Sequence, residues 1–164
     1  EHLGNPLRLR RPLDAGVKVV VAHCASLGEG HDTDKGGSAL VPNFDLFARL
    51  MDEPAYRGNL VGDIAAVTQG NRMGVVATLL ERRDWHDRLL NASDYPLPGV
   101  VPLIYLEALF KRKLLDPASL APLRGLRDFN SLLFDFVLKR SLALNGQGFP
   151  AAVFETAPWF KRPN

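Results

Sequence analysis

Short apolar runs alternate with segments of helical periodicity along the first hundred residues. The run at 17–22 is a β-branched stretch, the run at 59–67 is apolar apart from one acid, and a third short strand is expected at 88–94. Nearly continuous apolar runs are typical of strands covered on both faces in a parallel sheet. Between them, 43–51 and 72–83 carry apolar residues three and four positions apart, which predicts helices. Strands alternating with helices predict parallel pairing with right-handed crossovers, in an open sheet or a barrel.

Capping residues delimit the first helix, and a polar segment follows the first strand. Asn5-Pro6 predicts a helix start and Ala15-Gly16 its end. The segment 25–42 is rich in Gly, Asp, Ser and Thr and has no apolar period. Loops of this length are more often functional than idle, so we expect an active-site loop.

The chain changes character after Pro98. No convincing strand follows, and the apolar pattern predicts helices at 101–114 and 129–144, with a capped helix start at Asp116-Pro117 between them. In the last helix, residues spaced by three and four positions predict one buried stripe: Phe129, Leu132, Leu133, Phe136 and Val137. The aromatic tail from 149 to 160 is expected to pack on a larger body.

The amino-acid composition excludes some classes of protein and agrees with the predicted α/β fold. With 46% hydrophobic and 23% charged residues, the 164-residue chain is typical of one globular domain spanning 1–164. A net charge of +2 with scattered Lys and Arg gives no support to nucleic-acid binding. The single cysteine, Cys24, excludes an internal disulfide and a CxxC metal motif. No apolar run approaches the ~20 residues of a membrane helix and no leader is recognisable, so we expect a cytoplasmic protein without a membrane partner.

Two ionisable residues follow predicted strands. His23 ends the first strand and Asp94 the third, and the carboxyl ends of parallel strands meet at one edge of a sheet. Imidazole nitrogen and carboxylate oxygen together suit zinc or another divalent metal, which activates a bound water. Each residue also has a simpler interpretation, because a strand-end histidine is often structural and Ser-Asp-Tyr-Pro is a good turn sequence.

Other residues are weaker candidates for the same site. Asp63 lies inside the second strand, where it is either hydrogen-bonded within the fold or part of the site. His31, Asp32 and Asp34 in the polar loop could bind substrate or metal, or simply be solvated. Arg72 follows the second strand and could clamp an anionic substrate group, or contact solvent.

Two further residues are set aside. His86 precedes the third strand and is therefore expected at the opposite end of the sheet from the site. Cys24 is adjacent to His23, but neighbouring residues of a strand point to opposite faces. A thiol nucleophile is therefore not expected.

Three segments resemble strands of the amidohydrolase superfamily. Val-Lys-Val-Val-Val-Ala-His-Cys at 17–24 and Arg-Leu-Leu-Asn-Ala-Ser-Asp-Tyr-Pro at 88–96 resemble its sixth and eighth strands, and Asn-Leu-Val-Gly-Asp-Ile at 59–64 is similar to its seventh. The nearest subgroup is the amidohydrolase-2 type, which comprises metal-dependent hydrolases and decarboxylases with a (β/α)8 barrel. The resemblance covers most of residues 5–100.

This resemblance implies a metal site at the carboxyl end of a barrel. His23 would be a metal ligand or a catalytic histidine that polarises the substrate, and Asp94 would be a ligand that also shuttles a proton. The family's His-x-His pair and its fifth-strand ligand are not recognisable here; His2 stands where residues after a fifth strand would fall, with no strand before it. A full barrel has eight strands and about 250 residues, whereas three strands are predicted here.

We therefore expect an α/β fold that is part of a (β/α)8 TIM-type barrel: about three parallel strands with flanking helices and a C-terminal helical region. Its partner would be the missing N-terminal half of the barrel, or a second copy in a homo-oligomer.

The expected function is metal-dependent hydrolysis of an amide, ester or lactone bond in a small molecule, or a related decarboxylation. Zinc is the expected metal, with Asp94 handling the proton and Arg72 and His31 contacting the substrate. The alternative is a non-catalytic α/β interaction or regulatory module with an incomplete metal site, whose strand edge and aromatic tail bind a partner. An open nucleotide-binding sheet is disfavoured, because no GxGxxG or P-loop follows a strand.

Overall fold

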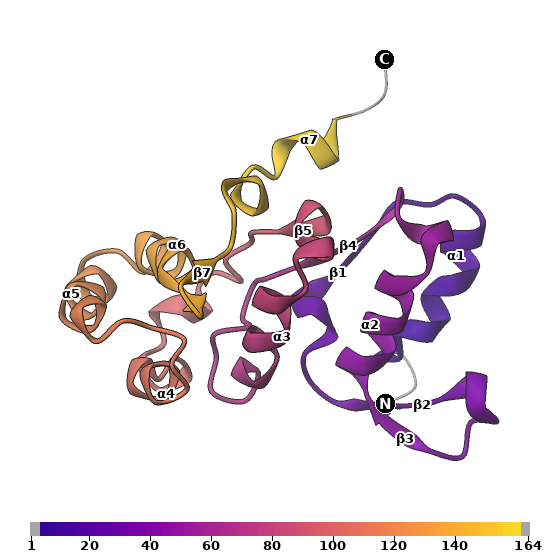
Figure 1. Cartoon of the computed structure of the whole chain (residues 1–164), viewed down its shortest axis with the longest axis horizontal. Coiled ribbons are helices and arrows are strands. Elements are labelled where there is room, and N and C mark those ends of the chain that lie inside the picture. The colour runs from indigo at the N-terminus through magenta and orange to yellow at the C-terminus, as the bar shows by residue number, and fades with distance from the viewer. Residues whose placement is uncertain (1–3, 162–164) are drawn as a thin grey trace.

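A three-stranded parallel sheet lies at the centre of the fold. The structure is a computed structural model that describes residues 4–161, so His2 lies outside the described residues. The strands are β1 (Val19–Val21), β4 (Leu60–Asp63) and β5 (Leu89–Leu90), in the order β1-β4-β5. In Figure 1 the sheet lies between α1 and α2 on one side and α4, α5 and α6 on the other. The predicted α/β class with parallel strands is confirmed, although each strand is shorter than expected.

The strand register brings three chain segments to one edge of the sheet. Val20 pairs with Val61, and Asp63 pairs with Leu90. All three strands run in the same direction, so their carboxyl ends lie together. His23 follows the end of β1 by two residues, and Asp63 is the last residue of β4.

Helices and short turns connect the strands. The N-terminal and connecting α-helices are α1 (Arg10–Asp14), α2 (Asn43–Asp52) and α3 (Val76–Glu81). Short 3₁₀ turns occupy 6–9, 33–35, 54–56, 73–75, 83–88, 97–99, 101–103, 117–119 and 151–154, and a tight turn with left-handed residues occupies 22–25. As predicted, the Asn5 side chain caps the first turn by accepting the Leu7 N–H, and Gly16, with a φ of 77°, follows the helix end.

Helix α2 supplies much of the core against the sheet. Its buried side chains are Asn43, Phe44, Leu46, Phe47, Leu50 and Met51. The Phe47 ring meets the Trp85 ring edge to face, with centroids 6.0 Å apart. Phe47 also reaches Gly62 in the central strand, where a methyl group would lie 2.6 Å from its ring. The central strand therefore needs a residue without a side chain at this position.

The polar segment 25–42 is more ordered than expected. It contains an antiparallel hairpin of β2 (Glu29–His31) and β3 (Leu40–Pro42), in which His31 pairs with Leu40. The expected active-site loop therefore contains a hairpin at these residues, and its role in an active site stays a prediction. Buried Gly30 explains the close packing, because a methyl group there would lie 2.7 Å from the Asn43 side chain.

The C-terminal third is helical, with one small hairpin. It contains α4 (Leu106–Lys111), α5 (Leu120–Phe129), α6 (Ser131–Ser141), α7 (Ala157–Phe160), β6 (Ala143–Leu144) and β7 (Gln147–Gly148). The pairing of β6 with β7 corrects the expectation that no strand follows Pro98. The predicted helix 101–114 is interrupted by extended residues at 104–105, and Asn130, which is also extended, separates α5 from α6.

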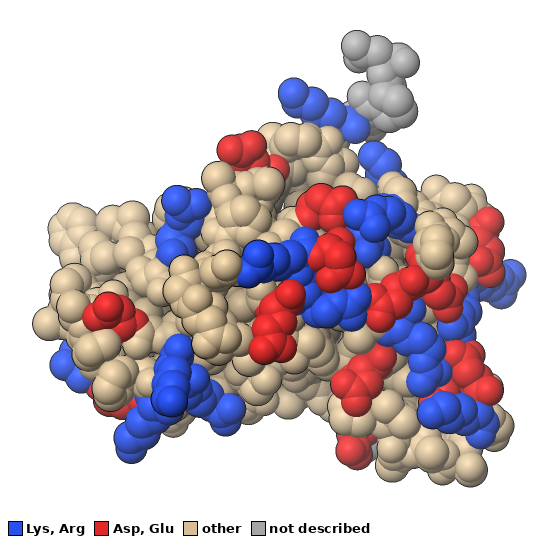
Figure 2. All heavy atoms as spheres, viewed as in Figure 1, with Lys and Arg blue, Asp and Glu red and all other residues tan. Residues whose placement is uncertain are grey.

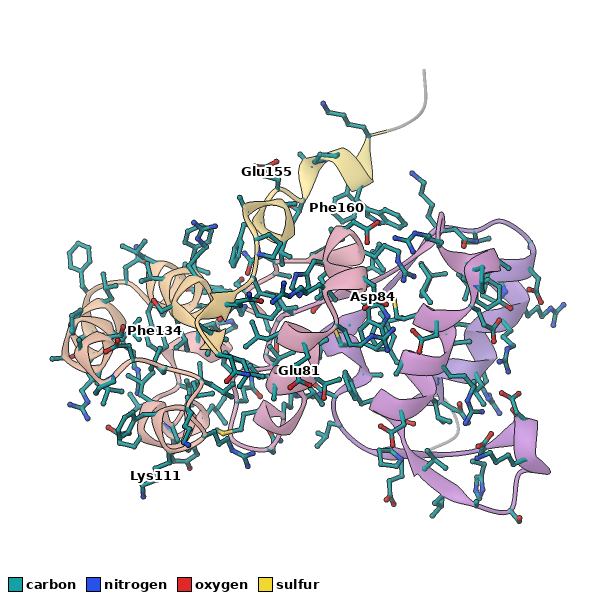
Figure 3. All side chains as sticks on the ribbon, viewed as in Figure 1. Glu81, Asp84, Lys111, Phe134, Glu155 and Phe160 are labelled. Atoms are coloured by element: carbon teal, nitrogen blue, oxygen red, sulfur yellow. The ribbon has the colours of Figure 1, made fainter. Side chains whose placement is uncertain are left out.

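Four of the five residues of the predicted buried stripe of the last helix are exposed, and Val137 is partly buried against the core. Phe129 is 83% exposed, and Leu132, Leu133 and Phe136 are 41–46% exposed. The buried face of α6 carries Phe134, Asp135, Leu138 and Lys139 instead. Figure 3 shows Phe134 between α5 and α6, where its ring also receives the Arg127 guanidinium 4.6 Å from its centroid. The two charged residues on this face form an ion pair with each other, so neither charge is buried without a partner.

The aromatic tail packs partly on the sheet. The Asn91 N–H next to β5 donates to the Val153 carbonyl at 2.8 Å, and Lys18 lies over the Trp159 ring at 5.0 Å. Phe160 on α7 remains 66% exposed (Figure 3). That the tail also packs on a larger body stays a prediction.

The surface mixes charges of both signs. Figure 2 shows acidic and basic side chains interleaved on the visible face, while the region over α5 and α6 is largely uncharged. Within residues 4–161, no helix combines the length and the apolar character needed to cross a membrane.

We expect Gly62→Ala to destabilise the fold by about 1–3 kcal/mol, the range for overpacking a well-packed core. The added methyl group would lie 2.6 Å from Phe47 and 2.8 Å from the Cys24 sulfur. Urea denaturation gives the free energy of unfolding. Gly74→Ala is the matched control, since nothing lies within 4 Å of that position, and it should be neutral or slightly stabilising. Equal effects at both positions would contradict the packing argument.

Candidate active site at the strand ends

His23 lies between two carboxylates at the carboxyl edge of the sheet. Its Nδ1 is 3.6 Å from Oδ1 of Asp63, and its Nε2 is 3.8 Å from Oδ2 of Asp94. All three side chains are partly exposed. The structure therefore brings together the two residues that the sequence singled out, and adds the residue whose role was left open.

The backbone that carries these side chains is conformationally strained. His23, Cys24 and Ala25 have φ values of 56°, 50° and 50°, and Asp94 has 55°. The left-handed conformation costs roughly 1–2 kcal/mol per residue other than glycine. His23 thus lies in a left-handed turn rather than at the end of a strand. Such strain in several non-glycine residues is typical of functional sites, where surrounding contacts must compensate for it.

Asp63 provides that compensation. Its Oδ1 accepts hydrogen bonds from the backbone N–H groups of His23 and Ala65, both at 2.9 Å. One carboxylate oxygen therefore joins the turn after β1 to the turn after β4. The two interpretations of Asp63, a hydrogen-bonded structural acid and a site residue, are both consistent with this geometry.

Cys24 is directed away from the site. Its thiol is fully buried and donates to the Asp63 carbonyl at 3.1 Å. Burial raises the pKa of the Cys24 thiol well above its ordinary value, and the Asp63 charge raises it further. The thiol stays protonated near neutral pH, which agrees with the expectation that it is no nucleophile.

A buried ion pair lies behind the end of β5, and sequence reasoning missed it. The Lys139 ammonium donates to Asp135 Oδ2 and to the Ala92 carbonyl, both at 2.6 Å. Lys139 is 0% exposed and Asp135 2% exposed. The available signal was the Asp–Lys spacing of four residues inside an otherwise apolar helix segment.

Arg72 lies near the turn that carries His23. Its Nη1 donates to Ser26 Oγ at 3.4 Å, a long hydrogen bond to a residue three positions after His23. Its Nε is buried without a hydrogen-bond partner among residues 4–161. The guanidinium is thus partly engaged with the turn.

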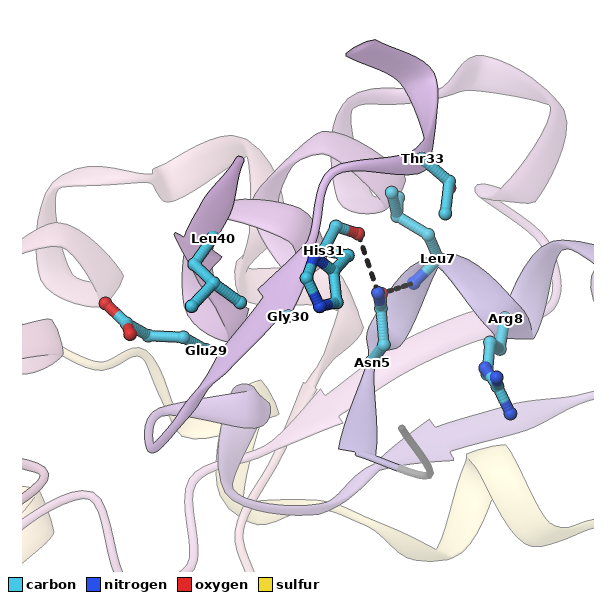
Figure 4. Close-up of a pocket in the computed structure, with 8 residues that line it drawn as sticks. All are labelled: Asn5, Leu7, Arg8, Glu29, Gly30, His31, Thr33 and Leu40. Atoms are coloured by element: carbon cyan, nitrogen blue, oxygen red, sulfur yellow. Dashed lines mark hydrogen bonds between the residues drawn. The ribbon is translucent and has the colours of Figure 1, made fainter. Parts of the chain in front are cut away.

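His31 lies apart from the strand-end residues. It lines a hollow of about 180 Å³ together with Asn5, Arg8 and Leu40, among others (Figure 4). The Asn5 side-chain amide donates to the His31 carbonyl at 2.8 Å. Neither His23 nor Asp94 lines this hollow.

The acids of the hairpin are held by arginines. Arg49 donates to both carboxylate oxygens of buried Asp32 at 2.8 Å, and to Asp34 at 2.7 Å. Asp34 also pairs with Arg10. These contacts join the hairpin to α1 and α2, so the two carboxylates have a structural role as partners in ion pairs.

The donor atoms of His23 and Asp94 are chemically suited to a divalent metal, but they are too few to hold one alone. Zinc bonds of about 2.0–2.2 Å to nitrogen and oxygen allow two ligands to lie 3.8 Å apart. Within the described residues, no group of three or more His, Cys, Asp or Glu side chains could hold a metal ion. Zinc sites use three or four protein ligands, so further donors would have to come from elsewhere.

The Asp32–Arg49 pair should make stability depend on acidic pH. Hydrogen bonds from Arg49 lower the pKa of Asp32 from 3.8 to about 2. The stabilisation is therefore fully present above about pH 4 and is lost as pH falls toward 2. Urea midpoints between pH 2 and 5 should fall more steeply for the wild type than for Asp32→Asn. An Asp128→Asn variant, which changes an exposed carboxylate, should follow the wild type; parallel curves for all three would exclude the effect.

Asp63→Ala should destabilise the protein by about 2 kcal/mol, since it leaves the N–H groups of His23 and Ala65 without their acceptor. Asp63→Asn keeps an acceptor oxygen and should cost less. The free energy of unfolding, measured with urea, tests both variants. A smaller loss for Asp63→Ala than for Asp63→Asn would mean that Asp63 does not hold the two turns.

Comparisons with known proteins give no indication of function, so the functional proposal depends on the geometry of His23, Asp63 and Asp94. No protein-family model, no curated protein and no solved structure matches this chain.

Proposed function

We propose that this chain contributes His23 and Asp94 to the active site of a metal-dependent hydrolase of the amidohydrolase type. The reaction would be hydrolysis of an amide, ester or lactone bond in a small molecule, or a related decarboxylation. The observation that carries the proposal is the 3.8 Å separation of His23 Nε2 and Asp94 Oδ2 at the carboxyl edge of a parallel sheet. In parallel α/β enzymes, catalytic groups collect at this edge.

The sheet would be part of a (β/α)8 barrel. In the described residues β1 has a strand neighbour on one side only, and Val20 on β1 and Val17 just before it are exposed. An exposed edge of this kind is a template for pairing with another strand. The remaining strands and metal donors would come from the N-terminal half of the barrel, or from a second copy of the chain.

The metal site would use His23 Nε2 and Asp94 Oδ2 as two of its ligands. Zinc suits this combination of imidazole and carboxylate. A bound divalent metal would supply Lewis acidity toward a water molecule and the scissile carbonyl group. Asp63, which holds the His23 backbone, would keep the imidazole between the two carboxylates.

Proton transfer is assigned to Asp94. Its side chain is partly exposed and can therefore reach a substrate, and Oδ1, the oxygen that is not assigned to the metal, would take the proton of the attacking water. The same oxygen would then deliver the proton to the leaving group. Cys24 takes no part, because its thiol is buried and protonated.

Substrate binding is assigned to Arg72 and His31. Arg72 is attached to the His23 turn through Ser26, and its guanidinium would pair with an anionic substrate group. His31 contributes if the substrate extends over the hairpin to the hollow beside Asn5.

A second candidate function is a non-catalytic interaction module. It is favoured by the exposed apolar residues of the α5–α6 region, especially Phe129, and by the limited number of metal donors within residues 4–161. Large exposed apolar patches commonly mark protein interaction sites. Metal binding discriminates between the two functions.

The hydrolase proposal predicts that the full chain, purified with any tightly bound partner, binds zinc. Asp94→Ala and His23→Ala should each lose most of this binding, because each removes one ligand. Isothermal titration with zinc chloride measures the affinity. Hydrolysis of para-nitrophenyl acetate provides an activity probe, in which Asp94→Asn should lower kcat by about 10²–10⁴-fold.

His31→Ala is the matched control for zinc binding, since His31 lies in a separate hollow and should leave the affinity unchanged. Native mass spectrometry is expected to show a second barrel component or a second copy. A stable lone monomer of 18.1 kDa that binds no zinc would contradict the proposal and favour the interaction module.

A further inference from the structure

The Asp135–Lys139 ion pair contacts the segment between β5 and Asp94. Lys139 approaches from α6, and its ammonium is hydrogen-bonded to the Ala92 carbonyl at 2.6 Å, two residues before Asp94. Asp135, one helical turn earlier, accepts from the same ammonium at 2.6 Å. The pair thus joins α6 to the segment that follows β5.

Stability alone is a weak explanation for this pair. Removing two charges from water costs several kcal/mol for each ion, and apolar replacement of such pairs is often neutral or stabilising. The neighbouring buried residues Phe134 and Leu138 show that apolar side chains are accommodated on this face of α6. An ion pair at this position therefore calls for a reason beyond packing.

The location of the pair supplies that reason. Burial lowers the pKa of Lys139, and the carboxylates of Asp135, Asp63 and Asp94 oppose this effect through their charges. The ammonium is thus within electrostatic reach of both carboxylates beside His23. Asp94 itself has the left-handed φ of 55°, so the chain leading to it needs to be held in place.

We propose that Lys139, with Asp135 as its counter-ion, is a positioning residue that fixes the Ala92 carbonyl and thereby holds Asp94 facing His23. The metal-binding consequence of this role rests on the proposed function. The structural consequence of this role, that Asp94 is held 3.8 Å from His23, does not depend on the proposed function.

The decisive variant is Asp135→Leu/Lys139→Met. It removes two opposite charges, so the net charge near the site is unchanged, and it leaves no buried ion without a partner. We expect its thermal midpoint to stay close to that of the wild type. Zinc affinity by isothermal titration should fall about tenfold or more, as for other residues that orient metal ligands. In its crystal structure the separation between His23 Nε2 and Asp94 Oδ2 should no longer be 3.8 Å.

Three single variants separate positioning from stability. Lys139→Arg keeps a donor for Ala92 and should bind zinc within about threefold of the wild type, well short of the tenfold loss. Asp135→Asn keeps the Lys139–Ala92 bond, so it should lower the thermal midpoint but not the zinc affinity. Arg140→Met, an exposed change on the same helix, should alter neither.

Two results would overturn the proposal. The first is a double variant that keeps the wild-type zinc affinity and the wild-type His23–Asp94 separation. The second is a zinc affinity that falls in proportion to the thermal midpoint across the three single variants, and this test also applies if the double variant does not fold. If the wild type binds no zinc, the hydrolase proposal fails, and the His23–Asp94 separation in crystals of Lys139→Arg, Asp135→Asn and the double variant still tests positioning.

Discussion

Parallel pairing of β1, β4 and β5 is the constraint on which the rest of the structure depends. Because the strands run in one direction and in a defined register, the chain emerges from all three at the same edge. Asp63 and Asp94, which follow His23 in sequence by 40 and 71 positions, thereby come to lie on either side of it. The helices cover the sheet, and the strand ends stay accessible.

Polar contacts compensate for the backbone strain at the carboxyl edge of the sheet. Three consecutive left-handed residues would be unfavourable alone, and the Asp63 carboxylate supports them through two backbone hydrogen bonds. On the other side, Lys139 bonds the carbonyl of Ala92 ahead of left-handed Asp94. In both cases a buried or partly buried charged group forms a hydrogen bond with the backbone, and such a charge-assisted hydrogen bond is stronger than a neutral one.

Local patterns were informative where one physical effect dominated. The β-branched run before His23 predicted a strand, and Asn5 and Gly16 predicted the limits of the first helical segment. They failed where two effects competed. Phe129, the last residue of α5, and Leu132 and Phe136 in α6 have the spacing of a buried stripe. Helix α6 nevertheless buries its opposite face, where the two charged side chains pair with each other.

The sequence by itself determined the alternation of strands and helices and the position of His23 and Asp94 in segments that follow parallel strands, because both come from short-range periodicity and from the single direction of parallel strands. Only the tertiary structure decided the hairpin within 25–42, the buried face of α6, and the attachment of Asp63 and Lys139 to the site. These depend on contacts between residues as much as 47 positions apart, as between Lys139 and Ala92, which no local pattern encodes.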